Sequence, residues 1–289
     1  MRFGVVANTK RPGARDALKR FSLWARDKGH QLMASSDLEE LGDGSIQYTP
    51  RAELPGQADF LVSMGGDGTL LAAARLVGAS EVPILGINLG SLGFLTQQAS
   101  KDLLAALDAI VAGNYRIESR MILKTEVKAG TTLGEPFALN DVVLNNGPIS
   151  RLIDIELRVN GESIVTYRAD GLIIATPTGS TAYSMAAGGP IIQPGMQAIV
   201  ATPISSFSLN SRPLVFSSDD RLELTTGPGS ERPTLTLDGQ VMVMLKPEDE
   251  VMISRAHFDL KLVVFPESSF YKVLRRKLHW GLGPLNEES

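Results

Sequence analysis

The chain has 289 residues, enough for two domains, and its 43% hydrophobic and 21% charged residues are typical of a globular protein with a sizeable core. Lys and Arg number 28 against 32 Asp and Glu, and this formal charge of −4 disfavours nucleic acid as a partner. The absence of cysteine excludes disulfides, thiolate metal sites and cysteine nucleophiles, and three scattered histidines (His30, His257 and His279) disfavour a histidine metal centre or a Ser-His-Asp hydrolase.

The first 115 residues alternate short apolar runs with helical patterns. The apolar runs predict strands over residues 2–7, 30–34, 60–64 and 82–87. Apolar side chains at helical spacing predict helices over residues 14–28, 69–77 and 101–111. Strands that alternate with helices favour a parallel sheet with helices on both faces.

The pattern changes to many short strands between residue 116 and about residue 265. Residues 153–159 alternate apolar and charged side chains, as expected for a half-buried strand. Asn160-Gly161 follows and predicts a hairpin turn, because both turn positions need a positive φ; residues 164–167 would form the return strand. A second hairpin is expected around Asp238-Gly239, and a basic helix over residues 268–277.

These patterns predict two domains. The first is an α/β domain of residues 1–115, joined by a C-terminal helix within about 266–289, and the second is a β-rich domain of residues 116–265. No apolar run reaches the ~18 residues of a membrane span, and the first residues lack the long apolar stretch of a signal peptide. We therefore expect a cytoplasmic protein without a membrane partner.

The motif Gly65-Gly66-Asp67-Gly68-Thr69 lies between a predicted strand and a predicted helix. Its glycines allow close approach to a ligand, and the N–H groups at the helix start favour a phosphate. Asp67 is the one acid among these donors, so it would stay ionised and could take a proton or hold Mg²⁺. The alternative is a tight turn with Asp67 as the helix N-cap, but the strand–loop–helix setting favours a ligand site. The motif is neither a P-loop nor the usual dinucleotide fingerprint.

Two further segments are ambiguous by themselves. Asn140-Asp141 could pair with an adenine edge and accept from ribose hydroxyls, although an Asx-turn is the more common use of such a pair. Residues 168–190 place Arg168 and Asp170 before a buried strand, which leads into a hydroxyl-rich loop where Tyr183 could stack on a base. Composition alone favours a polar loop with a stabilising Arg-Asp pair.

Two shorter signals lie elsewhere in the chain. Residues 88–94 form a second glycine-containing loop after a strand, expected beside the first loop at the carboxyl edge of the sheet. Asp238-Gly239-Gln240 is most simply a hairpin turn.

Five segments stand in the order seen in NAD kinases, and the sequence resembles the bacterial members of that family over roughly residues 1–275. These segments are residues 65–69, 86–95, 139–141, 170–184 and 237–240. The glycine-aspartate loop is shared with diacylglycerol-type lipid kinases and phosphofructokinases, whereas the run from Asp170 to Tyr183 is highly specific.

The resemblance implies an active site in the cleft between an α/β domain and a β domain. The implied reaction transfers the γ-phosphoryl group of ATP to the 2′-hydroxyl of the adenosine ribose of NAD, giving NADP, with Mg²⁺ or another divalent cation. Members of the family are homo-oligomers, commonly dimers or tetramers, whose subunits share pocket residues. No metal ligand is assigned.

The resemblance also implies roles for individual residues. Asp67 would be the general base, Asn140 would read adenine, and Asp141, at a position that is often Glu, would accept from a ribose hydroxyl. Arg168 would favour NAD over NADH. The other positions implied to contact the phosphates or the dinucleotide are Gly65, Gly66, Gly68, Thr69, Arg151, Asp170, Thr181, Ala182, Tyr183, Ser184, Met185, Ala186 and Gln240.

Two alternative functions stay open at this point. A lipid kinase would use the glycine-aspartate loop on a diacylglycerol-like alcohol, but the Thr-Gly-Ser-Thr-Ala-Tyr run argues against it. A non-catalytic module would bind NAD without turning over ATP, but the intact Asp67 and Asn140-Asp141 argue against that.

Overall fold

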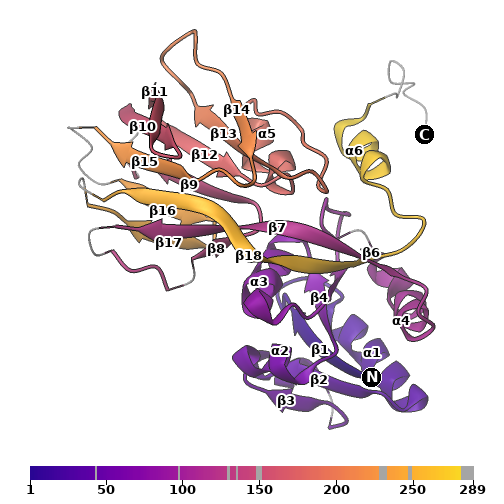
Figure 1. The fold of residues 1–289 in the computed structure, drawn as a ribbon. Helices are drawn as coiled ribbons and strands as arrows, with labels where there is room; N and C mark the ends of the chain where they lie inside the picture. The colour runs from indigo at the N-terminus through magenta and orange to yellow at the C-terminus, as the bar shows by residue number, and fades with distance from the viewer. Residues whose placement is uncertain are drawn as a thin grey trace. The chain divides into compact units, whose positions relative to one another are not determined.

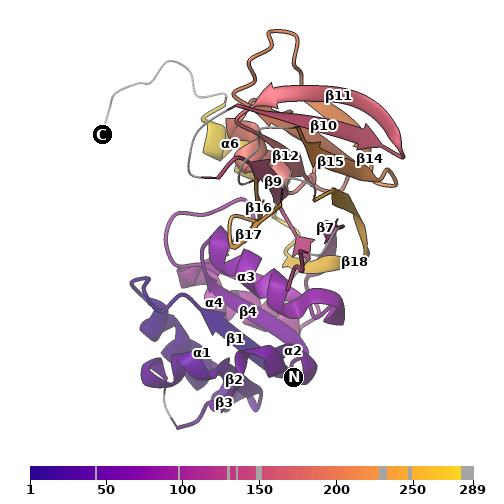
Figure 2. The same ribbon diagram turned by 90° about the vertical axis from the view of Figure 1, so that its left-hand side faces the viewer.

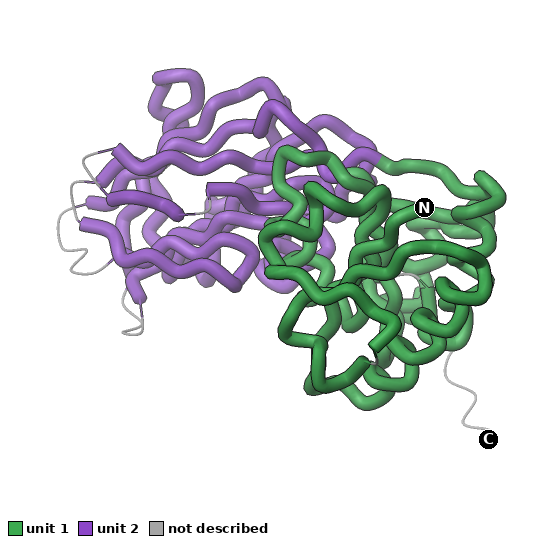
Figure 3. Tube along the Cα trace, turned by 90° about the horizontal axis from the view of Figure 1, so that it is seen from below, with its two compact units in different colours: residues 1–118, 261–289 green, residues 119–260 purple. Residues whose placement is uncertain are grey.

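The computed structural model describes residues 1–42, 44–96, 98–128, 131–134, 136–147, 152–227, 233–246 and 249–280. The chain divides into two compact units, one of residues 1–118 with 261–289 and one of residues 119–260 (Figure 3). The chain leaves the first unit within β7 (Arg116–Val127) and returns to it within β18 (Val251–Val264). No helix in the described ranges is long and apolar enough to cross a membrane.

The first unit contains a parallel sheet, as the alternating pattern predicted. The strands follow the order β18–β5–β4–β1–β2–β3, with the last residues of β18 beside β5. Figure 1 labels β4, β1, β2 and β3 of this sheet. Their bounds are Arg2–Ala7 for β1, Gln31–Ser35 for β2, Gln47–Thr49 for β3, Phe60–Gly65 for β4 and Ile84–Asn88 for β5; the short β6 (Gln98–Ala99) also pairs with β5.

Helices cover both faces of this sheet. The α-helices of the unit are α1 (Ala14–Lys28), α2 (Leu54–Gln57), α3 (Asp67–Val77), α4 (Leu103–Val111) and α6 (Phe270–Leu278). Side chains of α1 and α4 share one core with Phe3 and Val5 of β1. Gly4 faces α2, and Gly86 faces Leu70 of α3 so closely that a Cβ would crowd it, which places these helices on the other face. Four short 3₁₀ turns, η1 (Ser36–Leu41), η2 (Arg51–Glu53), η3 (Gly78–Ser80) and η4 (Ser100–Asp102), complete the connections.

The second unit is a sandwich of antiparallel sheets. One sheet has six strands in the order β14–β13–β12–β9–β16–β17. Their bounds are Asp141–Asn145 for β9, Gly171–Ala175 for β12, Ala198–Ile204 for β13, Leu214–Ser217 for β14, Thr234–Leu237 for β16 and Val241–Met244 for β17. The other sheet contains β10 (Ile153–Val159), β11 (Glu162–Ala169), β15 (Leu222–Thr226) and the first part of β18. The short β8 (Phe137–Ala138) pairs with β7.

Apolar side chains from both sheets form the core of this unit. Leu172 of β12 and Leu144 of β9 pack in one cluster with Ile155 of β10 and Leu224 of β15. The predicted hairpin turn is confirmed: Asn160 and Gly161 have φ of 51° and 85°, and β10 pairs antiparallel with β11 (Figure 2). The return strand is longer than predicted.

Candidate active site

The two glycine-containing loops of the first unit lie side by side, as the sequence predicted. β4 and β5 are neighbours, and their last residues, Gly65 and Asn88, are register partners. The N–H of Leu89 donates to the carbonyl of Gly65 at 2.8 Å. Both loops therefore lie at the carboxyl edge of a parallel sheet, where such folds bind ligands.

The second loop holds the Asp67 carboxyl group. The N–H of Phe94 donates to Asp67 Oδ2 at 2.9 Å. Asp67 Oδ1 accepts the N–H groups of Leu95 and Thr96 at 3.2 and 3.0 Å and the Thr96 hydroxyl at 2.9 Å. A Cβ at Gly93 would overlap the carboxyl group, so this close approach needs glycine. Among the described residues, Oδ2 therefore has one donor and Oδ1 has three.

The glycine-aspartate motif also begins a helix two residues earlier than predicted. Gly66 is the N-cap of α3, in an extended conformation, and Asp67 is the first helical residue. A Cβ at Gly65 would overlap the side chain of Thr69, so the loop packs tightly on the first helical turn. The first turn of an α-helix presents N–H groups to an anion, which suits the predicted phosphate contacts of Gly65, Gly66 and Gly68. The N–H of Thr69, also predicted to contact phosphate, donates to the Gly66 carbonyl at 3.0 Å.

Three loops of the second unit meet at one end of its six-stranded sheet. Asp141 begins β9 and pairs with Ala175 at the end of β12, while Val142 pairs with Leu237 at the end of β16. The next residue, Asp238, accepts the N–H groups of Leu139, Asn140 and Asp141 at 3.0, 2.7 and 3.2 Å. Its own N–H donates to the carbonyl of Asp141 at 2.9 Å. Asp238 therefore fixes the start of β9, a role that the sequence did not reveal.

Asp141 is a buried carboxylic acid without a donor. It is 5% exposed, and no group in the described ranges donates a hydrogen bond to its carboxyl oxygens. Burial, and next the negative charge of Asp238, raise the pKa of Asp141 from 3.8 to about 7. Asp141 therefore carries a proton in a large share of molecules at neutral pH. The side chain of Asn140 is half-buried and also makes no hydrogen bond to the described part of the chain.

The hydroxyl-rich segment after β12 packs against Asn140. The Thr176 N–H donates to the Asn140 carbonyl at 2.9 Å, and a Cβ at Gly179 would overlap the Asn140 backbone. Tyr183 begins the short helix α5 (Tyr183–Ala186) and is 47% exposed, so its ring is accessible for stacking. Ser184 is fully buried, with its hydroxyl paired to Thr202.

The remaining predicted residues of this segment differ in exposure. Thr181 is buried, and its hydroxyl donates to the carbonyl of Thr178 at 3.2 Å. Ala182 and Met185 are half-buried, and Ala186 is exposed.

Arg168 and Asp170 lie away from this edge, because Ala175 at the other end of β12 is the residue that pairs with Asp141. Arg168 and Asp170 precede β12, and Asp170 donates its N–H to Ile204. Tyr183 follows the other end of β12 and begins α5. Arg168 is exposed, and so is Gln240, which follows the hairpin turn. Arg151 lies outside the described residues.

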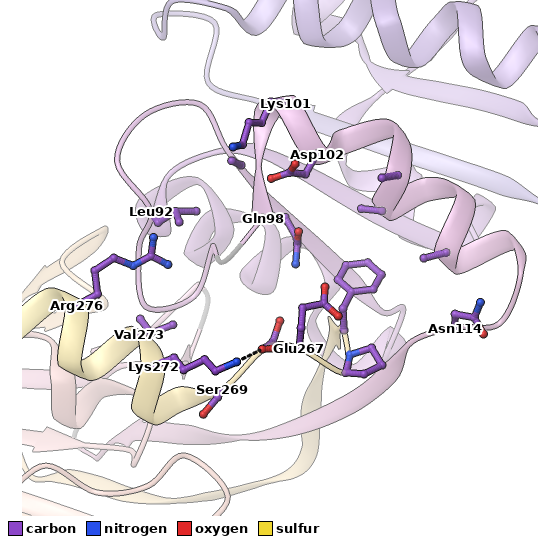
Figure 4. Close-up of a pocket in the computed structure, with 17 residues that line it drawn as sticks. Leu92, Gln98, Lys101, Asp102, Asn114, Glu267, Ser269, Lys272, Val273 and Arg276 are labelled. Atoms are coloured by element: carbon purple, nitrogen blue, oxygen red, sulfur yellow. Dashed lines mark hydrogen bonds between the residues drawn. The ribbon is translucent and has the colours of Figure 1, made fainter.

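A separate cavity of about 720 Å³ lies in the first unit, beside α4 and α6 (Figure 4). Lys101 and Asp102 line it before α4, and Lys272 and Arg276 line it from α6. None of the predicted site residues lines this cavity.

Comparison with known proteins identifies relatives over nearly the whole chain. Residues 3–115 match the family model of the ATP-NAD kinase N-terminal domain, and residues 139–265 match that of the C-terminal domain. An NAD kinase of Geotalea daltonii is 45% identical over 239 residues, which cover 82% of this chain and 84% of that protein. An NAD kinase of Syntrophotalea carbinolica is 40% identical over 282 residues, which cover 97% and 99%.

Solved structures show the same fold. A crystal structure of yeast NADH kinase complexed with NADH matches with a TM-score of 0.90 and 25% identity, over 100% of this chain and 90% of that one. An NAD kinase from Archaeoglobus fulgidus in complex with ATP matches with a TM-score of 0.77 and 26% identity, over 96% and 99%.

Proposed function

This chain belongs to the ATP-NAD kinase family, and we propose that Asp67 is the residue that receives the proton of the reacting hydroxyl. The chain is a kinase that phosphorylates NAD to NADP with ATP as the donor. The observation that carries the proposal for Asp67 is the uneven use of its carboxylate, with three donors on Oδ1 and one on Oδ2. Oδ2 is therefore the oxygen with capacity left for a substrate hydroxyl.

The chemistry of phosphoryl transfer fits such a group. The transition state is largely dissociative, so the protein contributes mainly position and charge stabilisation. The 2′-hydroxyl of the adenosine ribose donates a hydrogen bond to Oδ2, its oxygen attacks the γ-phosphorus of ATP, and the proton passes to Asp67 as ADP leaves. The amides of Phe94, Leu95 and Thr96 hold the carboxylate in place throughout.

The second unit supplies the proposed contacts to the dinucleotide. Asn140 offers to the adenine edge an amide that no described residue pairs with, Asp141 offers a carboxyl group for a ribose hydroxyl, and Tyr183 offers an accessible ring for stacking. The expected location of the active site between the two domains stays a prediction. The effect of Arg168 on the choice between NAD and NADH also stays a prediction, together with the contacts of Asp170 and Gln240.

A divalent cation fits this chain best as part of the substrate. No group of three or more His, Cys, Asp or Glu side chains within the described residues could hold a metal ion. Mg²⁺ commonly binds through substrate phosphates and one or two carboxylates. We propose that the cation arrives as the Mg²⁺ complex of ATP, where it neutralises phosphate charge. A homo-oligomeric state, a cytoplasmic location and the absence of membrane and nucleic-acid partners stay predictions.

The experiment that tests the role of Asp67 measures NADP formation from ATP and NAD. Asp67→Asn should lower kcat by ~10²- to 10⁴-fold, the usual contribution of a general base, while NAD still binds. Asp37→Asn, at an exposed position of the same unit, is the matched control and should retain wild-type kcat. Wild-type turnover in Asp67→Asn would refute the proton-acceptor role.

Two substrate tests separate the alternative functions. Phosphorylation of a diacylglycerol in place of NAD would indicate a lipid kinase. Binding of NAD without any turnover of ATP by the wild-type chain would indicate a sensing module.

A further inference from the structure

A chain of hydrogen bonds leads from β5 to Asp67, and its first bond, between Asn88 and Thr96, is buried. Asn88 Nδ2 donates to Thr96 Oγ1 at 2.7 Å, and the Thr96 hydroxyl donates to Asp67 Oδ1 at 2.9 Å. Asn88 Oδ1 accepts the N–H of Gly90 at 2.7 Å. We propose that Thr96 and Asn88 are positioning residues that orient Asp67, so that Oδ2 faces the reacting hydroxyl. This inference rests on the proposed role of Asp67.

The donors and acceptors fix the direction of each hydrogen bond. The backbone N–H of Gly90 can only donate, so the Asn88 atom that faces it is the oxygen, and the Asn88 NH₂ faces Thr96. The Thr96 oxygen accepts from that NH₂ group, and its single proton is left for Asp67. Because the Thr96 oxygen accepts from Asn88, the Thr96 hydroxyl proton is donated to Asp67 Oδ1.

Burial makes the two side chains hard to replace by water. Thr96 is 0% exposed and Asn88 is 3% exposed. A Cβ at Gly86 would come within 3.2 Å of Thr96 Cγ2, so the loop packs directly on β5 at this point. A hydroxyl removed here leaves the Asn88 donor and one Asp67 lone pair without a partner inside the protein.

The Thr96 hydroxyl increases the difference between the two oxygens of Asp67. With it, Oδ1 accepts three hydrogen bonds, and rotation of the carboxyl group breaks all of them. Without it, Oδ1 keeps two backbone hydrogen bonds, of 3.2 and 3.0 Å, and the carboxyl group turns more easily. A shift of about 1 Å at a reacting group can cost ~10²-fold in rate.

Thr96→Val tests the proposal, because valine has the shape of threonine without the hydroxyl. We expect kcat for NADP formation to fall by ~10- to 100-fold, while KM for NAD and for ATP changes by less than about two-fold. Thr96→Ser restores the hydroxyl and should recover kcat to within about three-fold of wild type. Thr166→Val, at an exposed position of β11, is the matched control.

A double mutant shows whether Thr96 acts through Asp67. In the Asp67→Asn background, Thr96→Val should cause no further loss of kcat, because residues that act as one unit are non-additive. A full additional loss in that background, or wild-type kcat in Thr96→Val, would overturn the positioning role. If Thr96→Val does not fold, Thr96→Ala is measured in the same two backgrounds, with the same expected and refuting outcomes. Full activity of Asp67→Asn would instead refute the base assignment itself.

Discussion

The raised pKa of Asp141 predicts that the native protein loses stability as pH rises, which is opposite to the usual effect of a carboxyl group. Its pKa is raised from 3.8 to about 7, by burial and then by the charge of Asp238. A raised pKa in the folded state means that the stabilisation is complete below the unfolded-state pKa and is lost as pH rises through 7. Ionised Asp141 therefore destabilises the native protein at alkaline pH.

The size of the effect follows from the shift. A shift of about 3 pKa units corresponds to about 4 kcal/mol at a pH well above 7, at 1.36 kcal/mol per unit. At about pH 5 most native molecules keep the Asp141 proton, and the loss of stability relative to strongly acidic pH is about 2 kcal/mol. Asp141→Asn removes the ionisation but keeps the shape. The difference in free energy of unfolding between Asp141→Asn and wild type should therefore grow by about 2–3 kcal/mol from about pH 5 to about pH 8.

Urea unfolding of the ligand-free protein at several pH values measures this difference. Asp219→Asn, at an exposed position of the same unit, is the matched control and should show no such pH-dependent gain. A difference between Asp141→Asn and wild type that stays constant across the pH range would refute the raised pKa. It would also remove the argument that Asp141 carries a proton near neutral pH.

Three further variants test other contacts of the site. Gly93→Ala places a Cβ on the Asp67 carboxyl group, so kcat for NADP formation should fall by at least ~10²-fold. Gly56→Ala, where the added Cβ meets open space, is the control and should not lower kcat. Equal kcat values in the two variants would contradict the contact. Tyr183→Ala should weaken NAD binding by ~10-fold in a titration if the ring stacks on a base, and unchanged affinity would exclude stacking. Asp238→Ala leaves three N–H groups without an acceptor, so it should lower the free energy of unfolding by about 2–4 kcal/mol, and an unchanged value in thermal unfolding would show that water replaces the carboxylate.

The features predicted well from sequence are those with a local cause. α1 runs from Ala14 to Lys28, as the apolar spacing predicted, and ends at Gly29 in the left-handed conformation. The Asn160-Gly161 turn has the positive φ values that its residues allow. β3 and α2 were not predicted, because three or four residues are too few to show a period.

The features that the sequence concealed depend on non-local pairing. The main donors to Asp67 are backbone N–H groups of Phe94–Thr96, and backbone groups carry no residue signature. Asp238 was interpreted as a hairpin residue, which is correct, as its φ of 52° shows. Its second role exists only because β16 lies beside β9.

The two acids of the proposed site illustrate how surroundings divide roles between identical side chains. Within the described residues, Asp67 receives four hydrogen bonds and Asp141 receives none, while the three amides at the start of β9 donate to Asp238. A carboxylate surrounded by donors can only accept a further proton or hydrogen bond. A buried carboxyl group that carries a proton near neutral pH can also donate one. Asp141 can thus donate a hydrogen bond to a ribose hydroxyl or accept one from it, whereas Asp67 can only accept one.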